Sequence, residues 1–177
     1  MSMLANTDEK FMTLALEEAR KALAAGDFPV GCVIADGRQV VASGFRIASR
    51  GAMANEIDHA EIVALRHLVN SPLDIPKERL CLYSTLEPCL MCFGAILISG
   101  IHRIVYAFED VMGGGTRCNR YEMPPLYRDI DLAIVGNVLR EESIALMRSF
   151  FSNPDNRYLR DTFFARYAMG HTAASAL

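Results

Sequence analysis

The stretch STLEPCLMC, residues 84–92, decides how this chain is interpreted. It joins an apolar strand, predicted over residues 80–84, to a helix predicted over residues 89–99. Cys89 and Cys92 are three positions apart at the start of that helix, so both sulfur atoms point to one face. A strand that leads directly into a helix is a building unit of α/β folds.

Strands and helices alternate on both sides of this stretch. Asp36-Gly37 is a tight-hairpin sequence between two apolar runs. Gly26 ends a helix that we expect to begin at Asn6, where Glu9 closes a capping box. His59-Ala60-Glu61 opens a further helix. The remaining predictions are strands over 30–35, 39–45, 103–108 and 132–135, a helix ending near Val69, a glycine- and proline-rich loop over 109–129, a helix over 138–151 and a helical piece up to Ala168.

This alternation predicts an α/β fold, a three-layer helix–sheet–helix sandwich with a mixed five-stranded sheet. We expect residues 1–152 to form one domain and residues 153–177 to form a C-terminal helical extension packed on it. Arginine–aromatic interleaving in the extension is able to grip nucleic acid, but packing on the domain or on a sister subunit is the preferred interpretation. The side chains concerned are Arg157, Tyr158, Arg160, Phe163, Phe164, Arg166 and Tyr167.

Composition excludes several classes of protein. The chain has 177 residues, 51% of them hydrophobic, and a net charge of −3, so nothing favours nonspecific nucleic-acid binding over a basic surface. Residues 1–10 lack the apolar core of a signal peptide, and the apolar run 89–98 is too short to cross a bilayer. We therefore expect a cytoplasmic protein without a membrane partner. Cys32 and Cys81, inside apolar runs, are expected in the core.

The two short motifs together carry the chemistry. Imidazole nitrogen and thiolate sulfur are ligands that zinc prefers. His59, Cys89 and Cys92 fill three tetrahedral positions and leave the fourth for water, as in a catalytic site. Glu61, two residues after His59, is then the proton carrier. The pattern predicts one Zn²⁺ per chain and a zinc-assisted hydrolysis.

Two other interpretations of the cysteine pair stay open at this point. Cys-x-x-Cys after a strand is also found in thioredoxin-like redox proteins. A purely structural zinc site would need a fourth protein ligand, which Cys118 of the glycine-rich loop is able to supply.

The chain resembles the cytidine deaminase superfamily over about residues 11–151. The likeness lies in FPVG at 28–31, HAEI at 59–62 and STLEPCLMC at 84–92, followed by GAI at 94–96. It is closest to the branch of bacterial tRNA adenosine deaminases, guanine deaminases and fungal-type cytosine deaminases. The resemblance implies zinc bound by His59, Cys89 and Cys92, Glu61 as acid/base, and a homodimer to which the apolar helix 89–99 contributes. The side chains and backbone expected to contact the substrate are those of Pro29, Val30, Arg46, Ala60 and Pro88.

One departure from this branch bears on the substrate. Arg46 occupies the position where purine-handling relatives carry asparagine, and a guanidinium has donors but no acceptor. Asn55 is an alternative source of an amide; Asp58 and Phe93 are also unusual. We therefore rank deamination of a free nucleobase, nucleoside or related heterocycle first. Editing of adenosine to inosine at the tRNA wobble position is the alternative, and a zinc-bearing binding protein without turnover is the rival from another class.

Overall fold

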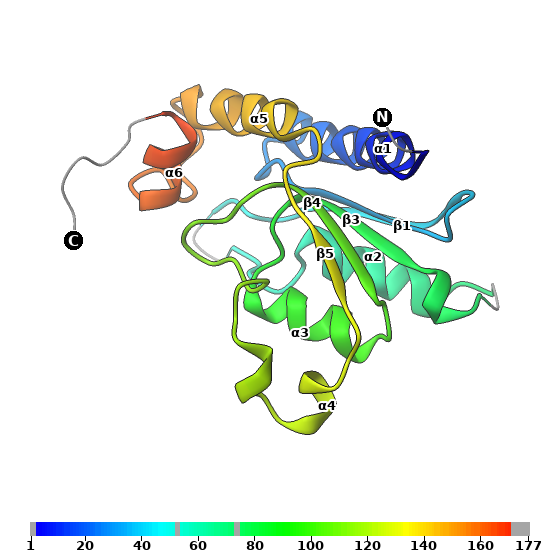
Figure 1. Cartoon of the computed structure of the whole chain (residues 1–177). Coiled ribbons are helices and arrows are strands. Elements are labelled where there is room, and N and C mark those ends of the chain that lie inside the picture. The colour runs from blue at the N-terminus through cyan, green and yellow to red at the C-terminus, as the bar shows by residue number, and fades with distance from the viewer. Residues whose placement is uncertain (1–2, 52–53, 73–74, 171–177) are drawn as a thin grey trace.

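The computed structural model describes residues 3–51, 54–72 and 75–170 and shows a sheet between two layers of helices (Figure 1). The strands are β1 Gly31–Ala35, β2 Val40–Phe45, β3 Cys81–Leu86, β4 Arg103–Phe108 and β5 Ala133–Val135. The helices are α1 Met3–Ala24, α2 Ala60–Val69, α3 Leu90–Ile98, α4 Pro125–Arg128, α5 Arg140–Ser152 and α6 Phe163–Ala168, with short 3₁₀ turns η1 Lys77–Arg79 and η2 Arg120–Glu122.

The five strands form one mixed sheet in the order β2-β1-β3-β4-β5. β1 pairs antiparallel with β2 and with β3, whereas β3, β4 and β5 run parallel. The predicted fold class, an α/β sandwich around a mixed five-stranded sheet, is confirmed. Because β3 and β4 are parallel, their carboxyl ends meet at one edge of the sheet, and the site described below begins there.

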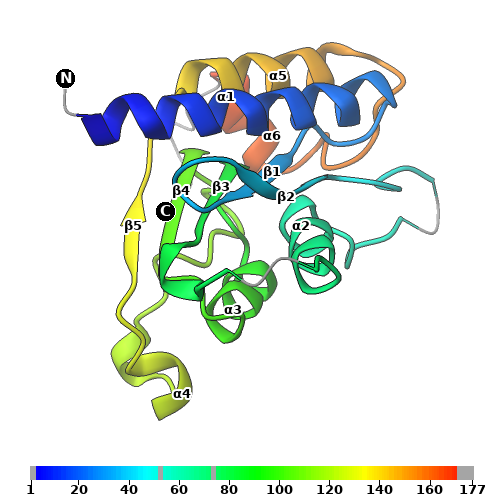
Figure 2. The same cartoon turned by 90° about the vertical axis from the view of Figure 1, so that its right-hand side faces the viewer.

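Helices cover both faces of the sheet. α1 and α5 lie side by side on one face, and α2 and α3 lie together on the other (Figure 2). α1 contributes Phe11, Met12, Ala15 and Leu16 to a core with Val33 and Tyr83, which is the spacing of one helical face. Cys32 and Cys81 are buried in these cores, as their apolar neighbours predicted.

Two glycines set how closely the helices approach the sheet. A Cβ atom on Gly31 would lie 2.2 Å from the carbonyl oxygen of Ala15 in α1. A Cβ atom on Gly44 would lie 2.6 Å from the carbonyl oxygen of Ala60 in α2. Both helices therefore cross the β1–β2 hairpin where no side chain separates the backbones. The approach at Gly44 holds the start of α2, and with it the HAE motif, against the sheet.

Most predicted elements are present within two residues of their expected bounds, and the hairpin turn at Asp36-Gly37 is confirmed. The amide groups of Arg38 and Gln39 donate to the Asp36 carboxylate. The predicted start of the first helix at Asn6 is wrong, because α1 already begins at Met3. Asp8, close to the expected cap, instead faces the sheet and bonds to Arg103.

The C-terminal extension is less helical than expected. Between residues 153 and 170, the described part of the extension, only α6 is α-helical, and turns fill most of the segment before it. Phe164, Ala165 and Ala168 are nevertheless buried in the main core. Of the aromatic stripe, Phe164 is buried whereas Phe163 is 41% exposed, and residues 171–177 of the extension lie outside the described residues. The division at residue 152 stays a prediction.

Among the residues that the structure describes, no helix is both long enough and apolar enough to cross a bilayer.

Candidate active site

The amino-terminal ends of α2 and α3 converge at one edge of the sheet. His59 is the N-cap residue of α2 and Cys89 is the N-cap residue of α3, and both have extended backbone conformations. Neither side chain caps its own helix, so both are available to a ligand. Cys92 follows one turn into α3, on the same face as Cys89.

The imidazole and the two thiols form a compact cluster. His59 Nδ1 lies 3.5 Å from Cys89 Sγ and 3.5 Å from Cys92 Sγ. The three ligand atoms all lie within 4.8 Å of one another, and within the described part of the chain they form the one group with metal-binding geometry. Cys118 does not belong to the group, so the structure gives no support to a fourth protein ligand.

These distances suit zinc. Tetrahedral bonds of about 2.0–2.1 Å to nitrogen and about 2.3 Å to sulfur require a nitrogen–sulfur separation of about 3.5 Å. The separations from His59 Nδ1 to both sulfur atoms have this value. With three protein ligands on one side, the coordination sphere is open toward the cavity described below, as in catalytic zinc sites.

One of the two cysteines is already predisposed to the thiolate form that a metal binds. A hydrogen bond from Cys92, assisted by His59, lowers the pKa of Cys89 to about 4 although burial opposes this change. The same pairing with Cys89, together with burial, raises the pKa of Cys92. One thiolate therefore exists at neutral pH, and the second proton leaves when a metal binds.

Glu61 lies beside this cluster on the first turn of α2. Its side chain is only 3% exposed. One carboxylate oxygen accepts a hydrogen bond from Ser84 of β3 at 3.0 Å, and the other lies 3.6 Å from Cys92 Sγ. Burial raises the pKa of Glu61, against the attraction of His59. A buried carboxyl with a raised pKa, next to a metal site, is suited to carry protons.

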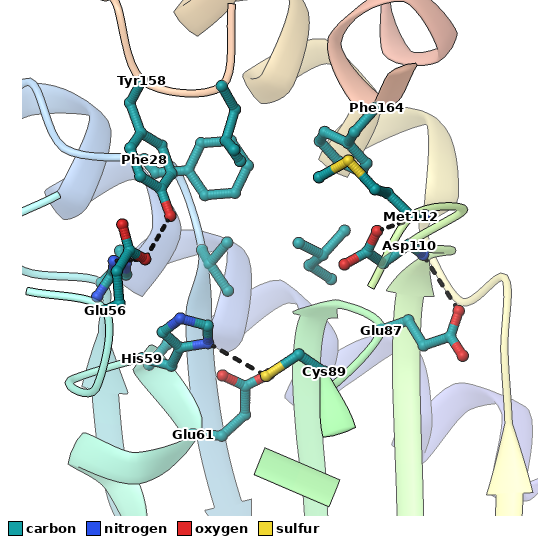
Figure 3. A pocket seen from close by; sticks show the side chains of 15 residues that line it. Phe28, Glu56, His59, Glu61, Glu87, Cys89, Asp110, Met112, Tyr158 and Phe164 are labelled. Carbon is teal, nitrogen blue, oxygen red and sulfur yellow. Dashed lines mark hydrogen bonds and ion pairs between the residues drawn. The ribbon is translucent and has the colours of Figure 1, made fainter. Parts of the chain in front are cut away.

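A cavity of about 180 Å³ opens above the cluster (Figure 3). His59, Glu61 and Cys89 lie at its floor, and Phe28 and Tyr158 lie opposite them. Drug-sized ligands occupy pockets of about 300–1,000 Å³, so this cavity suits a single heterocycle. The other lining residues are Val30, Arg46, Glu56, Ala60, Leu86, Glu87, Asp110, Met112, Leu159 and Phe164.

The expected substrate-contacting residues fall into two groups. Val30, Arg46 and Ala60 line the cavity. Pro29 and Pro88 are buried next to it but are not among its lining residues.

Asn55 does not supply the amide that Arg46 lacks. Its side-chain amide donates to Asp58, and its side-chain oxygen accepts from the backbone of Ile57 and Asp58. These bonds fold the loop before His59 instead of pointing the amide into the cavity.

Several lining residues were not predicted from the sequence. Glu87 is almost fully buried and accepts hydrogen bonds from the backbone of Asp110 and from Thr116, so it fastens the glycine-rich loop beside Cys89. The Glu-Pro-Cys motif was the available signal for Glu87. Tyr158 and Phe164 come from the C-terminal extension, and no local sequence pattern shows that this segment closes the cavity.

Comparisons with known proteins agree with this geometry. Residues 5–108 match the family model described as the cytidine and deoxycytidylate deaminase zinc-binding region. The tRNA-specific adenosine deaminase of Haemophilus influenzae is 38% identical over 148 residues, which cover 81% of this chain and 83% of that protein. The tRNA-specific adenosine deaminase of Bacillus subtilis is 31% identical over 146 residues, covering 81% of this chain and 88% of that protein.

A solved structure from work on A-to-I editing by tRNA:A34 deaminases has a similar fold. It is 30% identical to this chain, has a TM-score of 0.63, and the match covers 77% of this chain and 98% of that one. The family match includes His59, Cys89 and Cys92, and it removes the thioredoxin-like interpretation of the cysteine pair. The chain therefore belongs to the cytidine and deoxycytidylate deaminase family of zinc-dependent hydrolytic deaminases.

Proposed function

We propose that the chain removes the exocyclic amine of an adenosine within a tRNA, with His59, Cys89 and Cys92 as zinc ligands and Glu61 as the proton carrier. The observation that carries the chemistry is the buried Glu61 carboxylate beside this cluster, at the floor of a cavity for one heterocycle. A cavity of this depth and size takes a base only after the base has left its stack.

The residues divide the work as follows. Zinc, when bound, acts as a Lewis acid and lowers the pKa of water from about 15.7 to about 7. Glu61 accepts a proton from the attacking water and delivers protons to the ring nitrogen and to the amine. The water oxygen bonds to the amine-bearing carbon, the carbon–nitrogen bond breaks, and ammonia leaves a carbonyl behind. Ser84 orients the Glu61 carboxylate through its hydrogen bond.

The choice of substrate reverses the order derived from the sequence. The acidic net charge and Arg46 placed a free heterocycle first. The bacterial relatives at 38% and 31% identity are tRNA-specific adenosine deaminases, and they support the tRNA substrate better. The structure also weakens the argument from Arg46, because its guanidinium is engaged by Asn55 and Glu56 within the protein.

A specific observation keeps a small neutral substrate as the second candidate. The carboxylates of Glu56 and Asp110 lie on two sides of the cavity (Figure 3). A phosphate brought close to either would be repelled. An uncharged nucleobase or nucleoside would not meet this repulsion.

Ammonia release from a panel of substrates separates the two candidates. The panel holds adenine, guanine, cytosine, their nucleosides and an anticodon stem-loop with adenosine at the wobble position. Turnover of the stem-loop with inert free bases and nucleosides is the expected result. Turnover of a free base or nucleoside with an inert stem-loop would make the small molecule the substrate.

We also propose a homodimer that uses the outer face of α3. Leu90 and Ile98 on this helix are 58% and 60% exposed, and Leu126 of α4 is 65% exposed nearby. Solvent-exposed apolar side chains grouped on one face mark an interaction surface. Light scattering at micromolar concentration should give twice the chain mass, and Ile98→Asp should give the single mass; a wild-type monomer would contradict the dimer.

A further inference from the structure

The wall of the cavity opposite the zinc ligands carries a polar cluster that the chemistry does not use. It consists of Arg46 at the end of β2, Glu56 in the loop before His59, and Tyr158 in the C-terminal extension. Arg46 is buried, with 2% of its side chain exposed, and donates to the backbone oxygen of Asn55 and to Glu56 Oε2 at 3.0 Å. Its guanidinium also lies 5.8 Å from the centre of the Tyr158 ring.

Glu56 is held by one oxygen only. Arg46 and the Tyr158 hydroxyl, at 2.8 Å, both donate to Oε2. No hydrogen bond to Oε1 is present among the described residues, and the side chain is 57% exposed. The partners therefore hold the carboxylate in place at the lining of the cavity through Oε2 and leave Oε1 able to accept a further hydrogen bond.

Tyr158 helps to fix the position of the Glu56 carboxylate through its bond to Oε2. Its ring packs against Phe28, with ring centroids 5.4 Å apart, and its hydroxyl points to Glu56 (Figure 3). The same view places Glu56 on the Tyr158 side of the cavity, above the floor formed by His59 and Cys89. A base whose amine is at the floor therefore turns its far edge, or its sugar, toward Glu56.

We propose that Glu56 is a specificity-determining residue that accepts a hydrogen bond from a donor at the far end of the substrate. An ionised carboxylate is an acceptor only, so the matching ligand group is an N–H or O–H. In an adenosine the ribose hydroxyl is the available donor at that end; in a free purine base it is the N9–H. This inference rests on the proposed deamination and adds the group that is recognised.

Paired substrates that differ by one donor test the proposal. One pair is the anticodon stem-loop with adenosine or 2′-deoxyadenosine at the target position, and the other is adenine and 9-methyladenine. For the wild type, loss of the recognised donor should lower kcat/KM about 10- to 100-fold, the effect of one hydrogen bond to a charged group. In Glu56→Ala, removing the same donor from the substrate should change kcat/KM by less than about threefold, because the variant has already lost the acceptor.

Tyr158→Phe is the matched control. It removes one hydrogen bond to Oε2 and loosens the extension, but it keeps the free oxygen, so it should retain the wild-type discrimination. If Glu56→Ala loses discrimination within the stem-loop pair, the recognised donor is the ribose hydroxyl; if it loses discrimination between adenine and 9-methyladenine, the donor is the ring N–H. Wild-type discrimination retained by Glu56→Ala, or absent from both pairs in the wild type, would overturn this proposal alone. Absence of ammonia from every substrate would overturn the proposed function and this inference with it.

Discussion

At the scale of single residues, the site depends on a carboxylate that is unusual in its burial. Glu61 has Ser84 and Cys92 as its polar neighbours and is shielded from solvent. A buried ionisable group costs stability unless it is paired or hydrogen-bonded. Its position beside the metal-binding cluster indicates a role in the reaction that outweighs this cost.

Glu61→Gln should abolish ammonia release and leave zinc bound. General acid–base catalysis contributes about 10²–10⁴-fold, and the amide cannot carry the proton. Ammonia release and metal content, measured on the same preparation, check this. Ser84→Ala is the control, because it removes the orienting bond and keeps the carboxylate, so it should lose less activity. Retained turnover in Glu61→Gln would assign the chemistry to another group, and retained biological activity without turnover would favour a zinc-bearing binding protein.

Cys89→Ala should remove the metal, whereas Cys118→Ala should not. Both cysteines are partly exposed, but only Cys89 lies in the cluster. Losing one of three protein ligands leaves a site that cannot hold zinc at stoichiometry. Elemental analysis after gel filtration should give about one zinc per chain for the wild type and for Cys118→Ala. Loss of zinc from Cys118→Ala would make the site a four-ligand structural one.

At the scale of elements, the crossing of α2 over β2 is set by Gly44. Gly44→Ala should destabilise the protein by about 1–3 kcal/mol, because its Cβ atom would press on the backbone of α2. Gly94→Ala is the contrasting change: within one chain its Cβ atom meets nothing within 4 Å in a helix, so the folded monomer should gain about 0.5–1 kcal/mol. Denaturant unfolding measures both values. Equal effects would refute the close approach as the constraint.

The strands and the candidate metal cluster were predictable from the sequence. The hydrophobic period and Asp36-Gly37 predicted the strands, and the two motifs predicted His59, Cys89 and Cys92, which the fold brings together. The start of α1 was missed because the capping signal at Asn6 is local, and the helix continues through this residue back to Met3. Glu56 and Tyr158, 102 positions apart, meet only in the folded chain.

At the scale of the whole molecule, one ion pair joins the sheet to the helices that close the cavity. Glu109, directly after β4, accepts hydrogen bonds from Arg140 at the start of α5 and from Tyr167 of α6. Arg140 also lies 5.2 Å from the centre of the Phe108 ring. The C-terminal extension, which brings Phe164 to the cavity, is thereby tied to the end of β4.

The stability that Glu109 contributes through Arg140 and Tyr167 should be lost in acid, and a variant without the Glu109 charge tests this. Burial alone would raise the pKa of Glu109, but the bonds from Arg140 and Tyr167 lower it from 4.5 to about 2. A lowered pKa in the folded state adds stability above pH 4.5 that is lost as the pH falls toward 2. Glu109→Gln should therefore be less stable than the wild type by about 1–2 kcal/mol at neutral pH, after allowance for solvent screening.

The difference between wild type and Glu109→Gln should narrow as the pH falls from 4.5 toward 2, because protonated Glu109 resembles the amide. Urea unfolding at a series of pH values gives this difference directly. Asp129→Asn is the control, since Asp129 is 64% exposed in its pair with Arg128 and should show no resolvable difference at any pH. A gap between wild type and Glu109→Gln that stays constant with pH would mean that packing of the extension, and not the charge on Glu109, holds the cavity wall in place.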